Sequence, residues 1–138
     1  KNGADTSMVK QMFQDDMESF GDVATTVRSA ELLTGGVALA SVGEEMNNAP
    51  LIAAKSADEL IGIKGIEAAF VLGRDGESIS VSGRSLGNLN VQIICERLGG
   101  GGHLTMAGAQ LMNMDLEEAE AQVRTAIEHY MQEVQKAL

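Results

Sequence analysis

The chain has 138 residues, of which 44% are hydrophobic and 22% are charged, and a formal net charge of −10; this composition is typical of one globular domain with a hydrophobic core. One cysteine, two histidines and no apolar run of about 18–20 residues argue against a disulfide framework, a thiolate zinc site, a self-contained histidine metal centre and a membrane span. The acidic excess, which is concentrated in residues 1–50 and 113–138, disfavours general binding to nucleic acid, because phosphate contacts need Lys and Arg.

The first half of the chain predicts a helix, a strand and a second helix. Apolar residues at helical spacing predict a helix over residues 5–20, with Gly21 as its end. The short apolar run 37–42 predicts a buried strand, and a proline placed for a first turn predicts a helix over 50–61. Since aromatic residues are scarce and there are eight methionines, we expect an aliphatic core filled with methionine.

A hairpin and a third helix follow. Residues 66–72 and 77–82 have strand composition, and the glycine-rich segment 73–76 between them predicts the turn. Asn90 is placed to cap a helix over 91–98.

The last part of the chain predicts a strand and a final helix. Residues 106–112 are small and apolar, as expected of a strand, and Asp115 and Glu118 have the spacing of a capping box. The helix that follows carries an apolar stripe made of Leu116, Ala119, Val123, Ile127, Tyr130 and Val134. Because helices alternate with strands, the sequence predicts a single α/β domain with a mixed β-sheet flanked by helices.

Four consecutive glycines, residues 99–102, directly precede His103. Each glycine costs about 0.5–1 kcal/mol of chain entropy relative to alanine, so a run of four inside a domain calls for a reason. A backbone without Cβ atoms can approach a ligand closely and point N–H groups at an anion, whereas a helix C-cap with a loose connection needs only one or two glycines. A nearby phosphate would favour a protonated, donating imidazole, and His103 therefore favours the ligand interpretation.

A second polar group, Ser82-Gly83-Arg84-Ser85, comes at the end of a predicted strand. The planar guanidinium of Arg84 suits a phosphate or a base, although a surface ion pair would explain this arginine equally well. Helix capping alone would account for Asn90, and we expect structural roles for Cys95 and His129.

Taken in order, these motifs and Ala107-Gly108 resemble the DHH-associated substrate domain of DHH phosphoesterases, over nearly the whole chain. That superfamily includes single-strand exonucleases, nanoRNA/pAp phosphatases and cyclic dinucleotide phosphodiesterases. The run GGGGHLT followed by AGAQL, together with the opening residues 1–6, is most similar to the membrane-tethered, GdpP-like cyclic-di-AMP phosphodiesterases.

The resemblance assigns roles to particular residues. It implies a phosphate-binding loop made of Gly100, Gly101, Gly102 and His103. It also implies a substrate clamp made of Ser82, Arg84 and Ser85, with Asn90 as a supporting contact. Leu104 and Met106 stand where the family often has Pro and Ala, which bears on nucleotide preference. Residues 1–22 are expected to be a linker helix from a catalytic DHH domain, and residues 23–138 the substrate-binding domain.

The catalytic half of such an enzyme is not expected in this sequence. The chain starts at Lys1 rather than Met and lacks the Asp-His-His motif, so we expect a soluble piece of a longer protein with no catalytic or metal-binding residue and no cofactor of its own. The resemblance implies two Mn²⁺ ions in the missing domain of the same chain, hydrolysis of cyclic-di-AMP to linear pApA, and a full-length protein at the cytoplasmic face of a bacterial membrane. The expected partner is a cyclic dinucleotide or short oligonucleotide and not long nucleic acid, with a homodimer possible.

Three alternatives stay open at this point. The chain could be the substrate domain of a nanoRNase/pAp phosphatase, a nucleotide-sensing module without catalysis, or a dimerisation domain that uses its methionine-rich helical faces.

Overall fold

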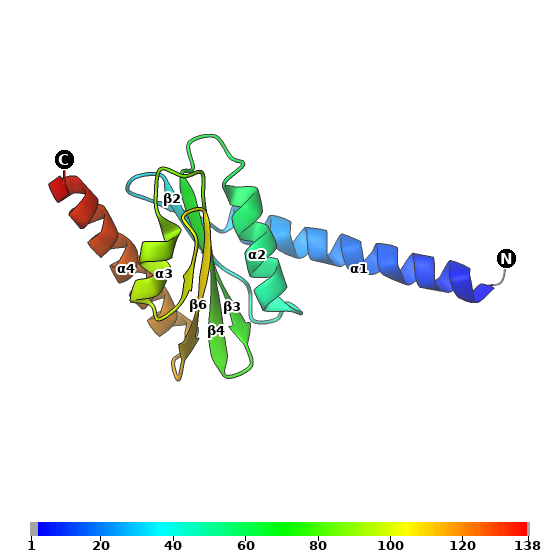
Figure 1. Ribbon diagram of the computed structural model, residues 1–138. Helices are drawn as coiled ribbons and strands as arrows, with labels where there is room; N and C mark the ends of the chain where they lie inside the picture. Colours follow the sequence, from blue (N-terminus) through cyan, green and yellow to red (C-terminus); the bar gives the residue numbers. More distant parts are fainter. Residues whose placement is uncertain (1–2, 138) are drawn as a thin grey trace.

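Six strands form one mixed sheet in the order β1-β2-β3-β4-β6-β5, and four helices pack around it in the computed structural model, which describes residues 3–137 and the side chains of 6–137 (Figure 1). The strands β2 and β3 are parallel and every other neighbouring pair is antiparallel. The elements are α1 Gly3–Arg28, β1 Glu31–Leu33, β2 Val37–Ser41, α2 Ala49–Leu60, β3 Ala68–Asp75, β4 Ser78–Ser85, α3 Val91–Arg97, β5 Gly101–Gly102, β6 Met106–Met112 and α4 Leu116–Ala137. The predicted single α/β domain with a mixed sheet is confirmed.

The two faces of the sheet carry separate hydrophobic clusters. Successive side chains of a strand point to opposite faces, and on β3 the residues Phe70 and Leu72 pack with α3 and α4, whereas Ala69 and Val71 pack with α2. Helix α2 lies over β3 and β4. On β6, the side chains on the α2 side of the sheet at Met106, Gln110 and Met112 are exposed. The half of this face over β6 and β5, next to β4, is therefore open.

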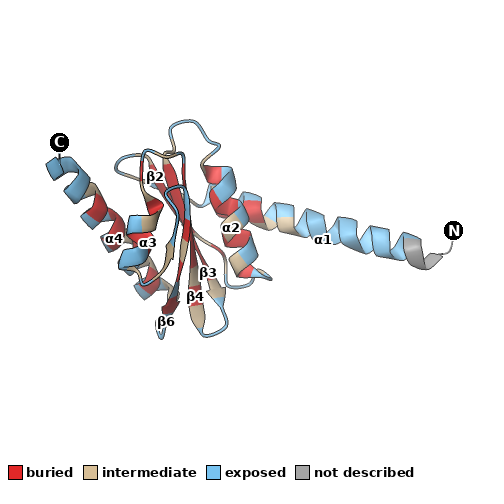
Figure 2. Cartoon of the chain, viewed as in Figure 1, coloured by how far each residue is buried: buried red, intermediate tan, exposed pale blue. Residues whose placement is uncertain are grey.

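Helix α1 is longer than its sequence pattern predicts. It runs to Arg28 and passes through Gly21, which was expected to end it. A glycine inside a helix costs only about 1 kcal/mol, and the next turns are held by packing, because Val23 and Val27 lie against the α2 cluster. Val23 is also the first buried side chain of α1, and the part of the helix before it projects away from the sheet (Figures 1 and 2).

The expectation of a methionine-filled core is wrong. No methionine belongs to the buried core, and three on α1 and two on β6 are exposed: Met8, Met12, Met17, Met106 and Met112. The aliphatic part of the expectation is confirmed, because the core is made mainly of Val, Ile, Leu and Ala, with Phe70 among its largest fully buried side chains. Met46, Met114 and Met131 are partly buried and pack against this core from outside. The helical spacing on α1 was recognised correctly, but spacing alone cannot tell whether a partner covers the apolar stripe.

The central hairpin is tighter than predicted. The strands β3 and β4 extend through Asp75 and Ser78, which pair directly, so that Gly76 and Glu77 form a two-residue turn in place of the predicted segment 73–76. Gly76 has φ +62°, as the first position of such a turn requires. Two short strands, β1 and β5, were not predicted at all.

The C-terminal half follows the sequence closely. The capping box is formed, since the Glu118 N–H donates to Asp115 Oδ1 at 2.8 Å and the Asp115 N–H donates to Glu118 Oε1 at 3.2 Å. The strand over 106–112 has the predicted bounds. Of the predicted stripe on α4, Val134 is exposed and Leu116 only partly buried. Within residues 3–137 no helix has the length and apolar character needed to cross a membrane.

Candidate functional site

The open half of the sheet brings most of the predicted site residues together. Pairing across three strands places Ser82, Gly108 and Gly101 in one row. Arg84 pairs with Met106, whose carbonyl accepts the His103 N–H at 2.7 Å. Directly paired residues point to the same face, so these positions share one face of the sheet. Helix α2 covers the β4 part of this face, where Ser82 is buried, and leaves the β6 and β5 part uncovered.

The spacing of the strands sets the scale of this surface. Neighbouring strands lie about 4.8 Å apart, so the backbones of Arg84 and His103 are separated by roughly 10 Å. Two long polar side chains across that distance can converge on one phosphate from opposite sides. In the strand order, β5 is the edge strand, β6 lies next to it and β4 is third.

The structural reason for having glycine differs among the four positions 99–102. Gly99, with φ +86°, ends α3, where its N–H and that of Gly100 donate to the carbonyls of Glu96 and Cys95. A Cβ on Gly100 would lie 2.0 Å from the Gly108 carbonyl oxygen. A Cβ on Gly102, which has φ +146°, would lie 2.5 Å from the Met106 carbonyl oxygen.

Gly101 is the exception in this run. A Cβ there would meet nothing within 4 Å, and its φ lies outside the left-handed region. The fold therefore needs glycine at 99, 100 and 102 but not at 101. Since the N–H groups of Gly99, Gly100 and His103 are bonded internally, this segment offers a ligand a bare surface at Gly101 and the exposed imidazole of His103, not a series of free backbone donors.

Ser85 holds the histidine loop in place. Its buried Oγ lies 2.7 Å from the Leu89 carbonyl oxygen and 3.2 Å from the Leu104 carbonyl oxygen, and its N–H donates to the Thr105 carbonyl at 3.0 Å. The side chain of Ser85 is thus committed to joining two loops. Its contribution to a site is to position the loop that carries His103.

Asn90 is committed in a similar way. Its Oδ1 accepts the N–H of Gln92 at 3.0 Å and that of Ile93 at 3.4 Å, as predicted for a helix cap, and its own N–H donates to the Tyr130 hydroxyl. Capping of this kind is typically worth about 0.5–2 kcal/mol. Asn90 fixes the start of α3.

Arg84 is held by two acceptors. Its Nε donates to Asp58 Oδ1 on α2 at 2.8 Å, and its Nη1 donates to the Gly83 carbonyl at 3.0 Å. The arginine side chain is 13% exposed and the aspartate 57%. Sequence reasoning missed Asp58, because no local pattern connects a residue on α2 with an arginine 26 positions later.

Two further residues, Cys95 and Arg97, lie within the core or away from this edge. Cys95 is fully buried against the sheet, and desolvation raises the pKa of its thiol to about 11, partly offset by the charge of Arg84. Arg97 forms an ion pair with Glu133 on α4. The expected structural role of Cys95 is confirmed.

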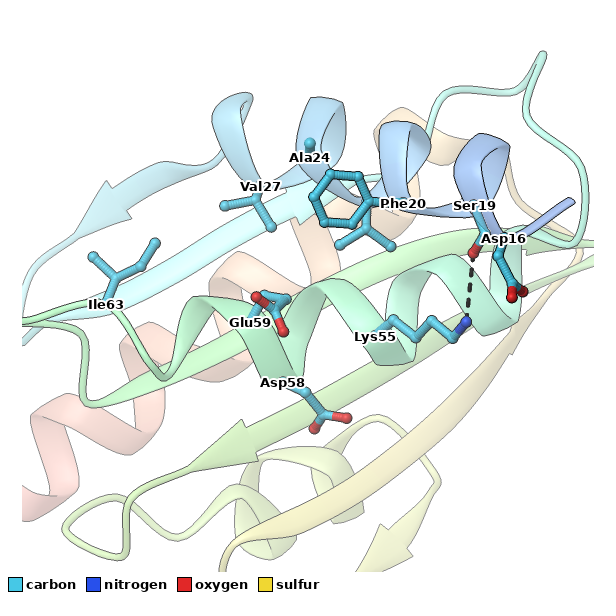
Figure 3. Close-up of a pocket in the computed structure, with 10 residues that line it drawn as sticks. Asp16, Ser19, Phe20, Ala24, Val27, Lys55, Asp58, Glu59 and Ile63 are labelled. Atoms are coloured by element: carbon cyan, nitrogen blue, oxygen red, sulfur yellow. Dashed lines mark hydrogen bonds between the residues drawn. The ribbon is translucent and has the colours of Figure 1, made fainter. Parts of the chain in front are cut away.

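A hollow of about 520 Å³ lies elsewhere, between α1 and α2 (Figure 3). Its walls are apolar at Phe20, Val23 and Val27, and its rim carries Lys55 and Asp58. None of the eight predicted site residues lines this hollow. Among residues 3–137, no three His, Cys, Asp or Glu side chains cluster in a way that could hold a metal ion.

The chain is similar to a known domain family and to two curated proteins. The model of the DHHA1 domain matches residues 34–133. The chain is 41% identical over 129 residues to the cyclic-di-AMP phosphodiesterase PdeA of Listeria monocytogenes and 39% identical over 131 residues to the cyclic-di-AMP phosphodiesterase GdpP of Geobacillus thermodenitrificans, covering 93% and 94% of this chain. It spans about one fifth of the length of each, 20% in both cases.

A more distant relative and a solved structure complete the comparison. The bifunctional oligoribonuclease and PAP phosphatase NrnA of Thermus thermophilus is 35% identical over 79 residues, which is 54% of this chain and 24% of NrnA. The crystal structure of an exopolyphosphatase-related protein from Bacteroides fragilis superposes with a TM-score of 0.70 at 19% identity, covering 94% of this chain and 44% of that one. This last likeness shows a shared fold.

Proposed function

Since the chain belongs to the DHHA1 domain family, we propose that it is the substrate-binding domain of a phosphodiesterase that hydrolyses cyclic-di-AMP to linear pApA. The observation that carries the proposal is the 41% identity to a cyclic-di-AMP phosphodiesterase over 93% of this chain. The positions of Arg84 on β4 and of Gly101 and His103 on the other side of β6 support it, because a phosphate needs donors and room for close approach.

In this proposal the chain's own residues bind and orient the dinucleotide. The outer edge of the Arg84 guanidinium would grip one phosphate or a base, and the imidazole of His103 would donate to a phosphate oxygen. Gly101 would let the ligand lie against the backbone. A preorganised donor is most useful where charge grows in the transition state, and the loop that carries His103 is fixed by Ser85.

The two Mn²⁺ ions that the family resemblance implies do not fit the residues of this chain. The His, Cys, Asp and Glu side chains of residues 3–137 form no cluster that could hold a metal ion. We therefore assign such ions to a separate catalytic DHH domain of the same protein, at the cytoplasmic face of a bacterial membrane, with residues 1–22 as the linker. Of this linker, residues 1 and 2 lie outside the described residues.

Calorimetric titration of this chain with cyclic-di-AMP at two ionic strengths tests the proposal. We expect weak, salt-sensitive binding, because few of the ten basic residues lie near the site and half of the pocket would belong to another domain. Arg84→Ala should weaken binding strongly, while Arg74→Ala, which removes an arginine in an ion pair with Glu44 at the far end of the hairpin, should leave it unchanged. Absence of binding by the wild-type chain would refute the proposal.

A second candidate is favoured by the similarity to NrnA. In that case the chain would serve an oligoribonuclease and PAP phosphatase. The same titration with pAp and with a short linear RNA separates the two functions, since a cyclic-di-AMP domain should prefer the cyclic ligand and an NrnA-like domain the linear ones.

A further inference from the structure

The ion pair between Asp58 and Arg84 has no part in the function described so far. Asp58 projects from α2, and Figure 3 shows its side chain directed away from α1, whereas Lys55 on the same helix reaches back toward Ser19. The Asp58 carboxylate is the more exposed partner, at 57%, and the guanidinium the more enclosed, at 13%. The ion pair thus joins an exposed carboxylate to a largely buried guanidinium at the border of the candidate site.

The contacts on the guanidinium divide it into a used side and a free side. Nε donates to Asp58 Oδ1 at 2.8 Å, and one Nη1 hydrogen is taken by the Gly83 carbonyl at 3.0 Å. A guanidinium has five N–H groups, so the second Nη1 hydrogen and both Nη2 hydrogens are left. The free Nη1 hydrogen and one of the two Nη2 hydrogens can act as the end-on pair of donors that grips a phosphate bidentately.

We propose that Asp58 is a positioning residue, which holds Arg84 with its end-on donors turned toward the open half of the sheet. An arginine side chain has many rotamers, and fixing it before the ligand arrives removes an ordering cost from binding. The inference rests on the proposed function, because Arg84 must contact the nucleotide for its orientation to matter.

Two other roles for Asp58 make different predictions. If the carboxylate competed with the ligand for Arg84, removing its charge would strengthen nucleotide binding. If the pair only joined α2 to β4, removing it would leave nucleotide binding unchanged, because the orientation of Arg84 would then not matter to the ligand.

The experiment compares Asp58→Asn and Asp58→Ala in this chain by titration with cyclic-di-AMP. Asparagine keeps an acceptor oxygen for Nε, so Asp58→Asn should bind within about twofold of wild type. Alanine releases the guanidinium, so Asp58→Ala should bind about three- to tenfold more weakly, the effect of reordering one long side chain. Glu44→Ala, which removes a comparably exposed carboxylate from the Nε of Arg74, is the matched control and should have no effect on binding.

A spectroscopic readout tests the geometry independently of affinity. The Nε–H proton of Arg84 should give a resolved nuclear magnetic resonance signal protected from exchange with water in the wild type and in Asp58→Asn, and should lose it in Asp58→Ala. In an Arg84→Ala background, Asp58→Ala should change binding no further, because Asp58 acts through Arg84.

Each outcome is decisive. Unchanged or tighter binding in Asp58→Ala overturns the inference while the proposed function stands, and so does a further loss of binding in the Arg84→Ala background. If the wild-type chain does not bind cyclic-di-AMP at all, the proposed function is refuted and this inference falls with it.

Discussion

The different reasons for the four glycines predict different effects when each is changed to alanine. At Gly101 the added methyl group meets nothing within 4 Å of the folded chain. Gly101→Ala should therefore fold normally and gain about 0.4–1 kcal/mol of stability, because alanine restricts the unfolded chain more than glycine does. Ligand binding should weaken by about tenfold or more, equivalent to about 1.4 kcal/mol, since the methyl group fills space that the phosphate would occupy.

Alanine at the neighbouring positions 100 and 102 should instead lower the stability of the fold. In Gly100→Ala the methyl carbon would start 2.0 Å from the Gly108 carbonyl oxygen and 2.7 Å from the Ala109 Cα atom, so backbone must move. Overpacking of this kind costs about 1–3 kcal/mol or more. Gly102→Ala combines a similar clash with φ +146° and should be destabilised at least as much.

The assay is urea unfolding of each variant, followed by titration with cyclic-di-AMP under folding conditions. Gly21→Ala is the matched control, because a Cβ there also meets nothing within 4 Å but lies on α1, far along the chain from the site. It should raise stability and leave binding unchanged. Wild-type affinity in Gly101→Ala would refute the idea that the ligand lies against this glycine, and wild-type stability in Gly100→Ala would contradict the close packing of residue 100 against β6.

Further predictions concern ionisable side chains. The hydrogen bond and the charge of Arg124 hold the pKa of the Glu31 carboxyl below its usual 4.5. The pair therefore stabilises the fold above about pH 4.5 and loses this effect as the pH falls through the lowered pKa. The small stability difference between wild type and Glu31→Gln should shrink in acid and in high salt. Buried Cys95, with a thiol pKa raised to about 11, should react with a disulfide reagent at pH 8 only when the chain is unfolded, and rapid stoichiometric labelling of the native chain would disprove its burial. In a longer protein that supplies the catalytic domain, His103→Ala should lower kcat by about 10²–10³ and change KM less, whereas His129→Ala should retain wild-type kinetics; equal kcat values for both variants would remove His103 from the site.

Local signals were sufficient for much of the fold. The capping box at Asp115 and Glu118, the cap at Asn90 and the strand 106–112 all depend on residues close in sequence, and each formed as predicted. The extension of α1 through Gly21 was missed because it depends on packing of Val23 against another helix. The short strand β5 was missed because glycine has no strand preference, and its pairing with β6 comes from tertiary contacts.

For the candidate site too, some features could be predicted from local sequence and others depended on tertiary contacts. The sequence singled out Arg84 and His103 by residue type, and their meeting at one edge follows from the antiparallel register of β4 and β6. The structural commitment of Ser85 and the partnership of Asp58 with Arg84 needed three-dimensional contacts. Composition was misleading for methionine, because a count of apolar residues does not say which of them face solvent.

The most direct test of the account is to map the amide shifts of the isotope-labelled chain during titration with cyclic-di-AMP. The account predicts that the largest shifts fall at Arg84, at Gly101 to His103 and at the start of β6, with α4 unperturbed, and that Arg84→Ala suppresses them together. Shifts centred on the hollow between α1 and α2, or on α4, would contradict the assignment of the open half-sheet as the nucleotide site.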